Sequence, residues 1–230
     1  MHPAKRELES GSMTGRSYGQ FCGLSRAMET VGERWALLIV RDLLVGPRRF
    51  TDLRRGLPRI PTNILSARLK ELELAGVVHR RVLPRPATSV VYELTPYGHA
   101  LEDVVLRLGL WGAMAMGDPE PGEIATVDSL TMALRSTFDA EAAAGLRVSY
   151  EFRLGDLVVS AVVDDGTLDV VQGPLPEADL VVETGAQLRA LMAGELAPAE
   201  AVGTGLVTLT GDPTELDRLV QVFRIPPMPS

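Results

Sequence analysis

Residues 22–111 show a specific order of helical and extended patterns that few folds can accommodate. A long stretch with apolar residues at helical spacing is followed by a Gly-Pro break, two short helices, a glycine stop and two extended runs around a proline-rich loop. These segments are Met28–Leu44, Gly46-Pro47, Phe50–Leu57, about Thr62–Ala75, Gly76 and the loop Leu83–Ser89. This order predicts a winged helix-turn-helix, in which one helix fits a DNA major groove and a hairpin contacts the adjacent backbone.

The second short helix carries the side chains that base reading requires. Leu65, Leu69 and Leu72 form one apolar stripe, and polar or small residues occupy the opposite face. Asparagine can pair with adenine, lysine with guanine or phosphate, and alanine can approach a thymine methyl group. For this pattern alone, an ordinary amphipathic helix with a solvated polar face is the alternative. The residues of this helix that we expect to contact DNA are Thr62, Asn63, Ser66, Ala67 and Lys70.

Arginines precede this helix and follow it in the hairpin. Arg48 and Arg49, with the pair at 54–55, are expected to contact the DNA backbone, although one or two of the four could instead form surface ion pairs with acidic neighbours. In the hairpin, Arg81 lies on the first strand. Arg85 lies between two prolines that stiffen the loop, which suits contact with a phosphate or a narrow minor groove.

The net charge of −7 is distributed unevenly, because the first half of the chain is basic and the second half is acidic. Residues 1–117 carry 17 Lys and Arg against 11 Asp and Glu, whereas residues 118–230 carry 6 against 19. Residues 41–85 alone hold 11 basic and 4 acidic side chains. The low overall isoelectric point therefore does not exclude nucleic acid, since the basic charge coincides with the helix-turn-helix pattern and the acidic half is not expected to touch phosphate.

The second half of the chain has a different pattern. Residues 117–123 form a polar Pro/Gly linker, and beyond it a helix over 127–144 precedes four extended runs joined by short turns. This order predicts an α+β domain in which helices cover an antiparallel sheet. The predicted strands are Arg147–Leu154, Leu157–Val163, Thr167–Val171 and Leu180–Glu183, followed by helices over 186–193 and 198–202, a strand over 206–210 and a last helix over 212–223. The expected boundaries are a tag or disordered arm (1–17), a DNA-binding and dimerisation domain (18–116), the linker (117–123), a second domain (124–224) and a tail (225–230).

A homodimer is expected from the helical pattern over Tyr97–Met116. Its apolar face is too wide to be covered by packing on one side, so the same helix of a second copy would cover the remainder, with help from the segment Phe21–Met28. The residues of this face are Leu101, Val104, Val105, Leu108 and Trp111.

Residues Cys22–Leu44, Gly46–Leu53 and Ile64–Leu72 resemble the HxlR-type bacterial transcriptional regulators. The similarity spans about Tyr18 to Trp111 and includes a Gly-x-Arg-Trp motif and an Arg-Phe-x-x-Leu motif. It implies a dimeric winged helix that binds operator DNA as a repressor or an activator. In some members an N-terminal cysteine, here Cys22, senses oxidants or electrophiles. From the residues alone, a buried structural cysteine is the expectation for Cys22.

The second domain resembles the sterol carrier protein type 2 fold, on the residues Leu180–Thr184, Leu188–Leu196, Pro198–Ala201 and Gly205–Pro213. That resemblance implies an apolar tunnel for a lipid or another hydrophobic molecule. The alternative is a domain that stabilises the dimer and binds nothing. The residues expected to line a tunnel are Leu157, Val159, Ala161, Leu191, Met192, Leu196, Val202, Leu206 and Phe223.

The sequence does not favour an enzyme. Its three histidines have no serine, cysteine or aspartate partner close in sequence, and Asp164-Asp165-Gly166 is better explained as a turn than as paired catalytic carboxylates. No metal-ligand cluster and no phosphate loop is recognised, and we expect no cofactor. The expected function is a cytoplasmic regulator that binds a pseudo-palindromic operator as a homodimer and responds to a hydrophobic small molecule. The alternative is the same regulator with a second domain that is structural or carries lipid.

Overall fold

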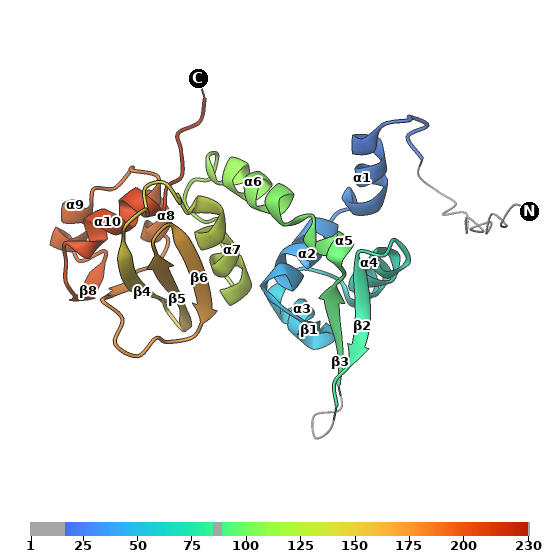
Figure 1. Ribbon diagram of the computed structural model, residues 1–230, viewed down its shortest axis with the longest axis horizontal. Coiled ribbons are helices and arrows are strands. Elements are labelled where there is room, and N and C mark those ends of the chain that lie inside the picture. The colour runs from blue at the N-terminus through green and yellow to red at the C-terminus, as the bar shows by residue number, and fades with distance from the viewer. Residues whose placement is uncertain (1–16, 85–88, 230) are drawn as a thin grey trace, which may run out of the picture.

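The computed structural model describes residues 17–84 and 89–229 (Figure 1). Nearly all of the arm expected over residues 1–17, and Arg85 of the hairpin loop, lie outside the described residues. The chain forms two modules, which we call the N-terminal module (residues 18–116) and the C-terminal module (residues 124–229). Figure 1 shows them side by side, with the wing hairpin of the N-terminal module pointing down.

The N-terminal module is the expected winged helix-turn-helix. Helices α3 and α4 form the helix-turn-helix, and strands β2 and β3 form the wing, with the two-residue strand β1 pairing with the other edge of β3. Its core consists mainly of leucine, isoleucine and valine side chains, among them the fully buried Ile39, Leu53 and Leu65. The elements are α1 (Gly23–Val31), α2 (Ala36–Val45), β1 (Arg48–Arg49), α3 (Phe50–Gly56), α4 (Thr62–Leu74), β2 (Val78–Val82), β3 (Val90–Leu94), α5 (Pro96–His99) and α6 (Glu102–Ala113).

Two helices predicted as continuous are each broken in two. The stretch Met28–Leu44 is divided between α1 and α2, with Trp35 in the left-handed backbone region (φ +82°) at the junction. The stretch Tyr97–Met116 is divided between α5 and α6. The threonine expected at its start is confirmed as a cap, since the hydroxyl of Thr95 accepts a hydrogen bond from the Gly98 N–H at 3.1 Å. Apolar spacing does not reveal such breaks because the helical period of apolar residues continues through them.

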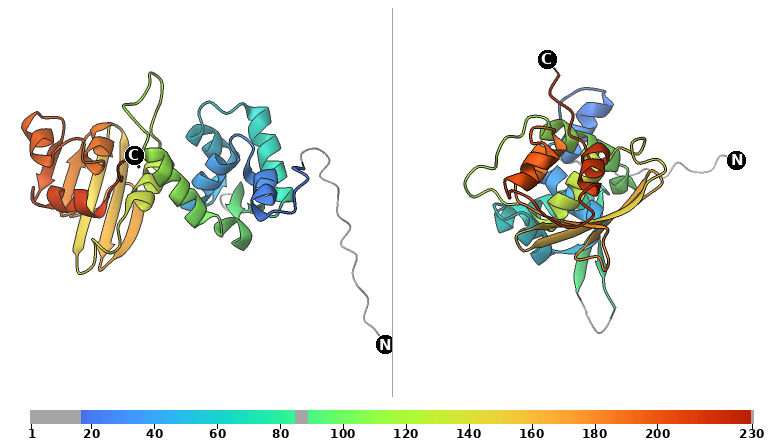
Figure 2. Two further views of the ribbon diagram at one scale, coloured as in Figure 1. Left: turned by 90° about the horizontal axis from the view of Figure 1, so that it is seen from above. Right: turned by 90° about the vertical axis from the view of Figure 1, so that its left-hand side faces the viewer.

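The C-terminal module is an α+β layer. Its five-stranded sheet has the order β6-β5-β4-β7-β8, and the helices pack on one face, above the sheet in the right-hand view of Figure 2. Residues from α7, α8 and α10 share a single buried cluster with alternate residues of the strands. The elements are α7 (Val127–Thr137), β4 (Arg147–Leu154), β5 (Leu157–Asp164), β6 (Thr167–Gln172), β7 (Leu180–Glu183), α8 (Gln187–Met192), α9 (Pro198–Gly203), β8 (Thr208–Gly211) and α10 (Glu215–Val222).

The prediction of a purely antiparallel sheet is wrong at one pair of strands. Strands β4 and β7 run parallel, because the chain leaves β6 at one edge, crosses the open face and enters the sheet again on the far side of β4. Hydrogen bonds fix this crossing to the strands beneath it. Ser160 Oγ donates to the Gly173 carbonyl at 2.9 Å, and the Leu175 N–H donates to the buried Glu151 carboxylate at 2.8 Å. The helix predicted over 127–144 also ends early, at Thr137.

Helix α7 joins the two modules. Its residues Leu130 and Leu134 belong to the core of the C-terminal module, whereas Met132 belongs to the core of the N-terminal module. Polar contacts reinforce the junction: Arg135 donates to the Leu44 carbonyl at 3.4 Å, and Arg48 forms an ion pair with Asp128. The two modules therefore share one continuous packed interface. In the part of the chain described here, no helix is long and apolar enough to cross a membrane.

Candidate DNA-binding surface

Helix α4 presents the polar face that its sequence predicts. Leu65, Leu69 and Leu72 are buried, and α4 packs through them on the core of the N-terminal module. The N-terminus of the helix follows Pro61, whose extended backbone and fixed φ allow a sharp start. The opposite face is open to solvent. Of the residues predicted there, Thr62, Asn63, Ser66 and Lys70 are exposed and Ala67 is half-buried.

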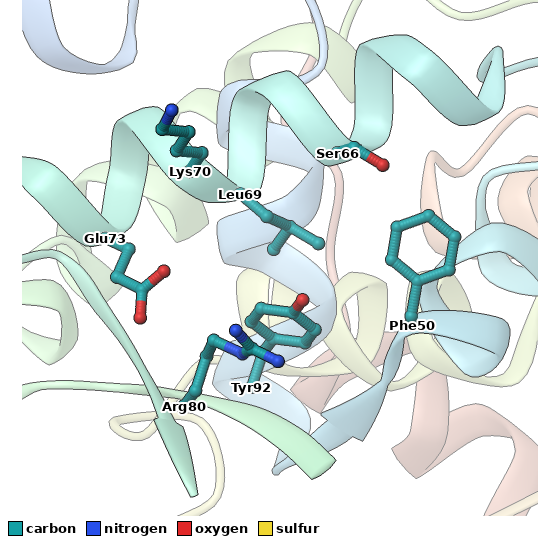
Figure 3. Close-up of a pocket in the computed structure, with 7 residues that line it drawn as sticks. All are labelled: Phe50, Ser66, Leu69, Lys70, Glu73, Arg80 and Tyr92. Carbon is teal, nitrogen blue, oxygen red and sulfur yellow. The ribbon is translucent and has the colours of Figure 1, made fainter.

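A shallow groove of about 390 Å³ separates α4 from the wing (Figure 3). Lys70 and Ser66 stand on its helix side, and Arg80 and Tyr92 stand on its strand side. The guanidinium of Arg80 lies over the Tyr92 ring, 5.7 Å from its centroid, which holds this cation at the rim of the groove. The lining residues are Phe50, Ser66, Leu69, Lys70, Glu73, Arg80 and Tyr92.

Arg80 is a candidate contact that the sequence pattern alone did not single out. Val78 is buried against the core, and side chains two residues apart on a strand point to the same face. Arg80 therefore faces α4, whereas Arg81 points to the other side of the wing. Strand alternation, counted from the buried Val78, is the signal that could have identified it.

Arg81 is paired across the wing. Its guanidinium contacts both carboxylate oxygens of Glu93 at 2.8 Å, and His79 Nε2 lies 2.8 Å from the same carboxylate. The hydrogen bond from Arg81 is the main reason why the pKa of Glu93 is lowered. Arg81 keeps about half of its side chain exposed, so it is available to a phosphate while held in position by Glu93.

The arginines near α3 have different surroundings. Arg49 is exposed, and its backbone N–H donates to Asp52 at 3.0 Å, which closes the first turn of the helix. Arg54 and Arg55 are exposed on the same helix, and a guanidinium nitrogen of Arg55 lies 3.9 Å from an Asp52 oxygen. This is one of the surface ion pairs that the sequence allowed.

Arg48 is half-buried at the junction between the two modules. Its Nε and Nη2 atoms donate to the two carboxylate oxygens of Asp128, at 3.0 and 2.5 Å, and Nη1 donates to the Pro47 carbonyl. Arg48 thus forms an ion pair between the modules, as the sequence allowed for one or two of these arginines, and its contact with the DNA backbone stays a prediction. Sequence could not show this, because the partner lies 80 residues further along the chain.

Known proteins resemble the N-terminal module. The profile of the HxlR-like helix-turn-helix family matches residues 30–120. YvaP of Bacillus subtilis, an uncharacterized HTH-type transcriptional regulator, is 41% identical over 86 residues, which make up 37% of this chain and 80% of YvaP. The HTH-type transcriptional regulator YodB of the same organism is 37% identical over 100 residues, 44% of this chain and 87% of YodB. The solved structure of reduced YodB covers 45% of this chain and all of that chain, at 36% identity and a TM-score of 0.38.

The chain belongs to the HxlR family. The assignment makes it a helix-turn-helix transcriptional regulator, and residues 30–120, which match the family, include the whole surface formed by α3, α4 and the wing.

The single cysteine of this HxlR-type chain is exposed, so the expectation of a buried structural cysteine is wrong. Cys22 occupies the N-cap position of α1, where backbone N–H groups are free to bind a negative charge. Hydrogen bonds from the backbone of Ser25 and then of Leu24 lower the pKa of the Cys22 thiol. This position favours the thiolate, the reactive form.

Most of the residues expected to line a hydrophobic tunnel are buried in the core of the C-terminal module. Phe223 is fully buried, with ring-centroid distances of 6.1 Å to Tyr150 and to Phe152, and 5.8 Å to Phe138. This aromatic cluster occupies the space between sheet and helices. Of the nine residues, Val159, Ala161, Leu191, Met192 and Phe223 are buried, Leu157 and Leu196 are half-buried, and Val202 and Leu206 are exposed.

Proposed function

We propose that this regulator binds a pseudo-palindromic operator as a homodimer, with α4 in the major groove and the wing against the flanking backbone. The observation that carries the proposal is the exposed polar face of α4 beside Arg80 of the wing, across the groove shown in Figure 3. Asn63 and Lys70 are the proposed base-reading residues. Arg49, Arg80 and Arg81 are the proposed phosphate contacts, since each keeps an exposed cationic side chain.

The DNA part of the proposal is tested on an operator that the protein itself selects. Selection from a random duplex library by the wild-type protein would give a preferred sequence, whose affinity is then measured by fluorescence anisotropy. We expect Asn63→Ala and Lys70→Ala each to weaken binding by about 5- to 100-fold, as loss of a base contact does. Arg147→Ala is the matched control, because it removes a cation from an exposed site in the C-terminal module. Unchanged affinity in both α4 variants would refute the placement of this helix.

A homodimer is supported by two exposed apolar surfaces in the N-terminal module. Phe21 and Leu24 at the start of α1 are exposed, as are Val104, Leu108 and Trp111 on α6, and Trp111 keeps 69% of its surface in contact with solvent. In Figure 1 α1 lies at the upper right of the N-terminal module and α6 runs from its top toward the C-terminal module, both on the side away from the wing. Large apolar residues gathered on one side are typical of an interface between subunits, and a two-fold axis would place two copies of α4 on one DNA duplex.

The oligomeric state is tested by light scattering coupled to size-exclusion chromatography. Leu108→Asp places a charge in the proposed interface, and we expect it to shift the mass toward that of a monomer. Leu74→Asp is the matched control, because Leu74 is an exposed leucine outside α1 and α6. A monomeric wild-type protein, or a dimer unaffected by Leu108→Asp, would contradict the proposed interface.

For the C-terminal module we propose the structural alternative instead of a tunnel for a hydrophobic effector. The buried aromatic cluster around Phe223 supports this choice, because a ligand would have to displace packed rings. Native mass spectrometry followed by organic extraction is expected to give the mass of the protein alone. A hydrophobic molecule that co-purifies with the protein would reverse the conclusion and identify the class of effector.

A second candidate property is favoured by the exposure of Cys22 and its lowered pKa. We propose that electrophiles or oxidants modify this thiol and change DNA binding. As the chain has one cysteine, the product is an adduct or a disulfide between two subunits. Diamide or a quinone should therefore change the operator affinity of the wild-type protein and leave that of Cys22→Ser unchanged. An equal response in Cys22→Ser would end this role for Cys22.

A further inference from the structure

The junction between the modules holds an ion pair whose two side chains come from different modules. Asp128, in the first turn of α7, accepts hydrogen bonds from Arg48 Nε and Nη2 at 3.0 and 2.5 Å. The side chains keep only 18% and 12% of their surfaces exposed. Charged groups shielded from water in this way interact more strongly than an ion pair on the surface.

Arg48 stands at the corner where the wing sheet meets the helix-turn-helix. It lies on β1, opposite Tyr92 of β3, and the chain enters α3 directly after Arg49. A shift of Arg48 would therefore move the start of α3 and the inner edge of the wing sheet together. Phe50, the first residue of α3, and Tyr92, which lies opposite Arg48, both line the groove beside α4.

Asp128 is held from its own side as well. Gln172, at the end of β6, donates its Nε2–H to Asp128 Oδ1 at 2.7 Å. The N-terminus of α7 is closed by reciprocal hydrogen bonds between Thr126 and Ser129, at 3.1 and 2.8 Å, which fix the first turn of the helix. The carboxylate thus links β1 of the N-terminal module to both a helix and a strand of the C-terminal module.

We propose that Asp128 is a positioning residue for DNA binding, through which the C-terminal module holds the β1–α3 corner in the geometry that fits the operator. This inference rests on the proposed function of α4 and extends it to the C-terminal module. Asp128 acts through Arg48 and does not touch DNA. Its negative charge by itself would repel phosphate, so the sign of the effect separates positioning from simple electrostatics.

The test measures the operator affinity of Asp128→Asn by fluorescence anisotropy over a series of salt concentrations. Positioning predicts a loss of about tenfold, typical of coupling between distant parts of a protein, with an unchanged slope of log affinity against log salt. Asp128→Glu, which keeps the charge, should recover most of the affinity. Tighter binding by Asp128→Asn would show that the carboxylate only repels DNA, and unchanged binding would show that the ion pair only stabilises the junction. Either result overturns the inference.

The double variant Arg48→Ala/Asp128→Ala tests whether the two residues act as a unit. If they do, it binds no more weakly than Asp128→Ala alone, and the salt slope is again unchanged. A weaker double variant with a shallower slope would show that Arg48 contacts phosphate directly, contrary to the inference. Gln172→Ala keeps the ion pair and removes only its support. It should weaken binding in the same direction by a smaller factor, and an unchanged affinity would contradict the inference.

Two controls keep the result interpretable. Asp164→Asn removes an acidic charge from an exposed ion pair in the same module, so its affinity should match that of the wild type. Thermal unfolding of each variant confirms that the affinity is measured on folded protein. If Lys70→Ala weakens binding and Asp128→Asn does not, this inference fails and the proposed function stands. If Lys70→Ala has no effect, the proposed function fails first.

Discussion

The two modules differ in what they leave uncovered. The N-terminal module buries one stripe of α4 but exposes its polar face, a basic wing, and apolar residues on α1 and α6. The C-terminal module instead gathers its large side chains, Tyr150, Phe152 and Phe223, into a closed core. The charge follows the same division, with an excess of basic residues in the first half and of acidic residues in the second. Surfaces left open by folding are those at which a protein can bind partners, and this is why the proposed DNA contacts and the proposed dimer interface both lie in the N-terminal module.

The closed core of the C-terminal module gives the largest expected effect. Phe223→Ala removes a fully buried ring that touches three other aromatic rings, so it should lower the free energy of unfolding by about 4 kcal/mol. Urea denaturation followed by near-ultraviolet circular dichroism measures this loss. Leu206→Ala, at an exposed position, is the control and should cost less than about 1 kcal/mol. A small effect of Phe223→Ala would show that the core is loose enough to admit a ligand.

A buried carboxylate beneath the junction should make stability depend on pH. Burial raises the pKa of Asp42 to about 6, and Asp128 adds repulsion, whereas Arg41 and Arg48 oppose the shift. This pKa exceeds the ordinary value of 3.8. Between these two pH values the carboxyl group of Asp42 is therefore protonated in the folded protein and ionised in the unfolded chain. Ionised Asp42 therefore lowers stability as the pH rises from about 4 to 6, and the loss persists above that.

The matching variant is Asp42→Asn, which removes the titration. We expect it to be more stable than the wild type by about 3 kcal/mol at pH 7.5, and to differ little from it at pH 4. Thermal or urea unfolding at a series of pH values measures the difference. A stability difference that does not vary with pH would mean that Asp42 is ionised throughout, held by its hydrogen bonds to Arg41.

Arg80 tests whether the wing of the N-terminal module contacts the DNA backbone. Arg80→Ala should weaken binding to every DNA sequence by about 1 kcal/mol and reduce the slope of log affinity against log salt by about one, as loss of one phosphate contact does. Arg80→Lys keeps the charge but loses the stacking on Tyr92, and should retain most of the slope. An unchanged slope in Arg80→Ala would place Arg80 away from the DNA backbone.

The smallest effect is expected on the exposed side of the C-terminal module. Asp164→Asn breaks an ion pair with Arg147 in which both side chains are mostly exposed to solvent. Because water and salt screen such pairs, the free energy of unfolding should change by less than about 0.5 kcal/mol. Urea denaturation at low salt is the most sensitive check, and a loss well above that size would indicate that this surface is less open than its exposure suggests.

Local patterns predicted much of the fold. The limits of α3 and α4, the strands of the wing and the first four strands of the C-terminal module follow from apolar spacing and turn residues, and each lies within a residue or two of its predicted position. Periodicity does not reveal the breaks at Trp35 and Ala100, because the apolar spacing continues through them. Nor does it reveal the parallel pairing of β4 with β7, since the direction of a strand depends on the path of the chain between the strands.

The helix that carries the polar residues suited to DNA could be identified from residue spacing alone, because the period of 3.6 residues places Asn63, Ser66 and Lys70 opposite the leucine stripe. Which arginines of the described residues face the groove and which face the other module depends on how the chain packs. Arg80 faces the groove because Val78 is buried, and Arg48 faces Asp128 because α7 packs on the N-terminal module. Residue spacing predicts only local structure because backbone periodicity acts over a few residues. An ion pair, in contrast, forms wherever folding brings two charges together, however far apart they lie in the sequence.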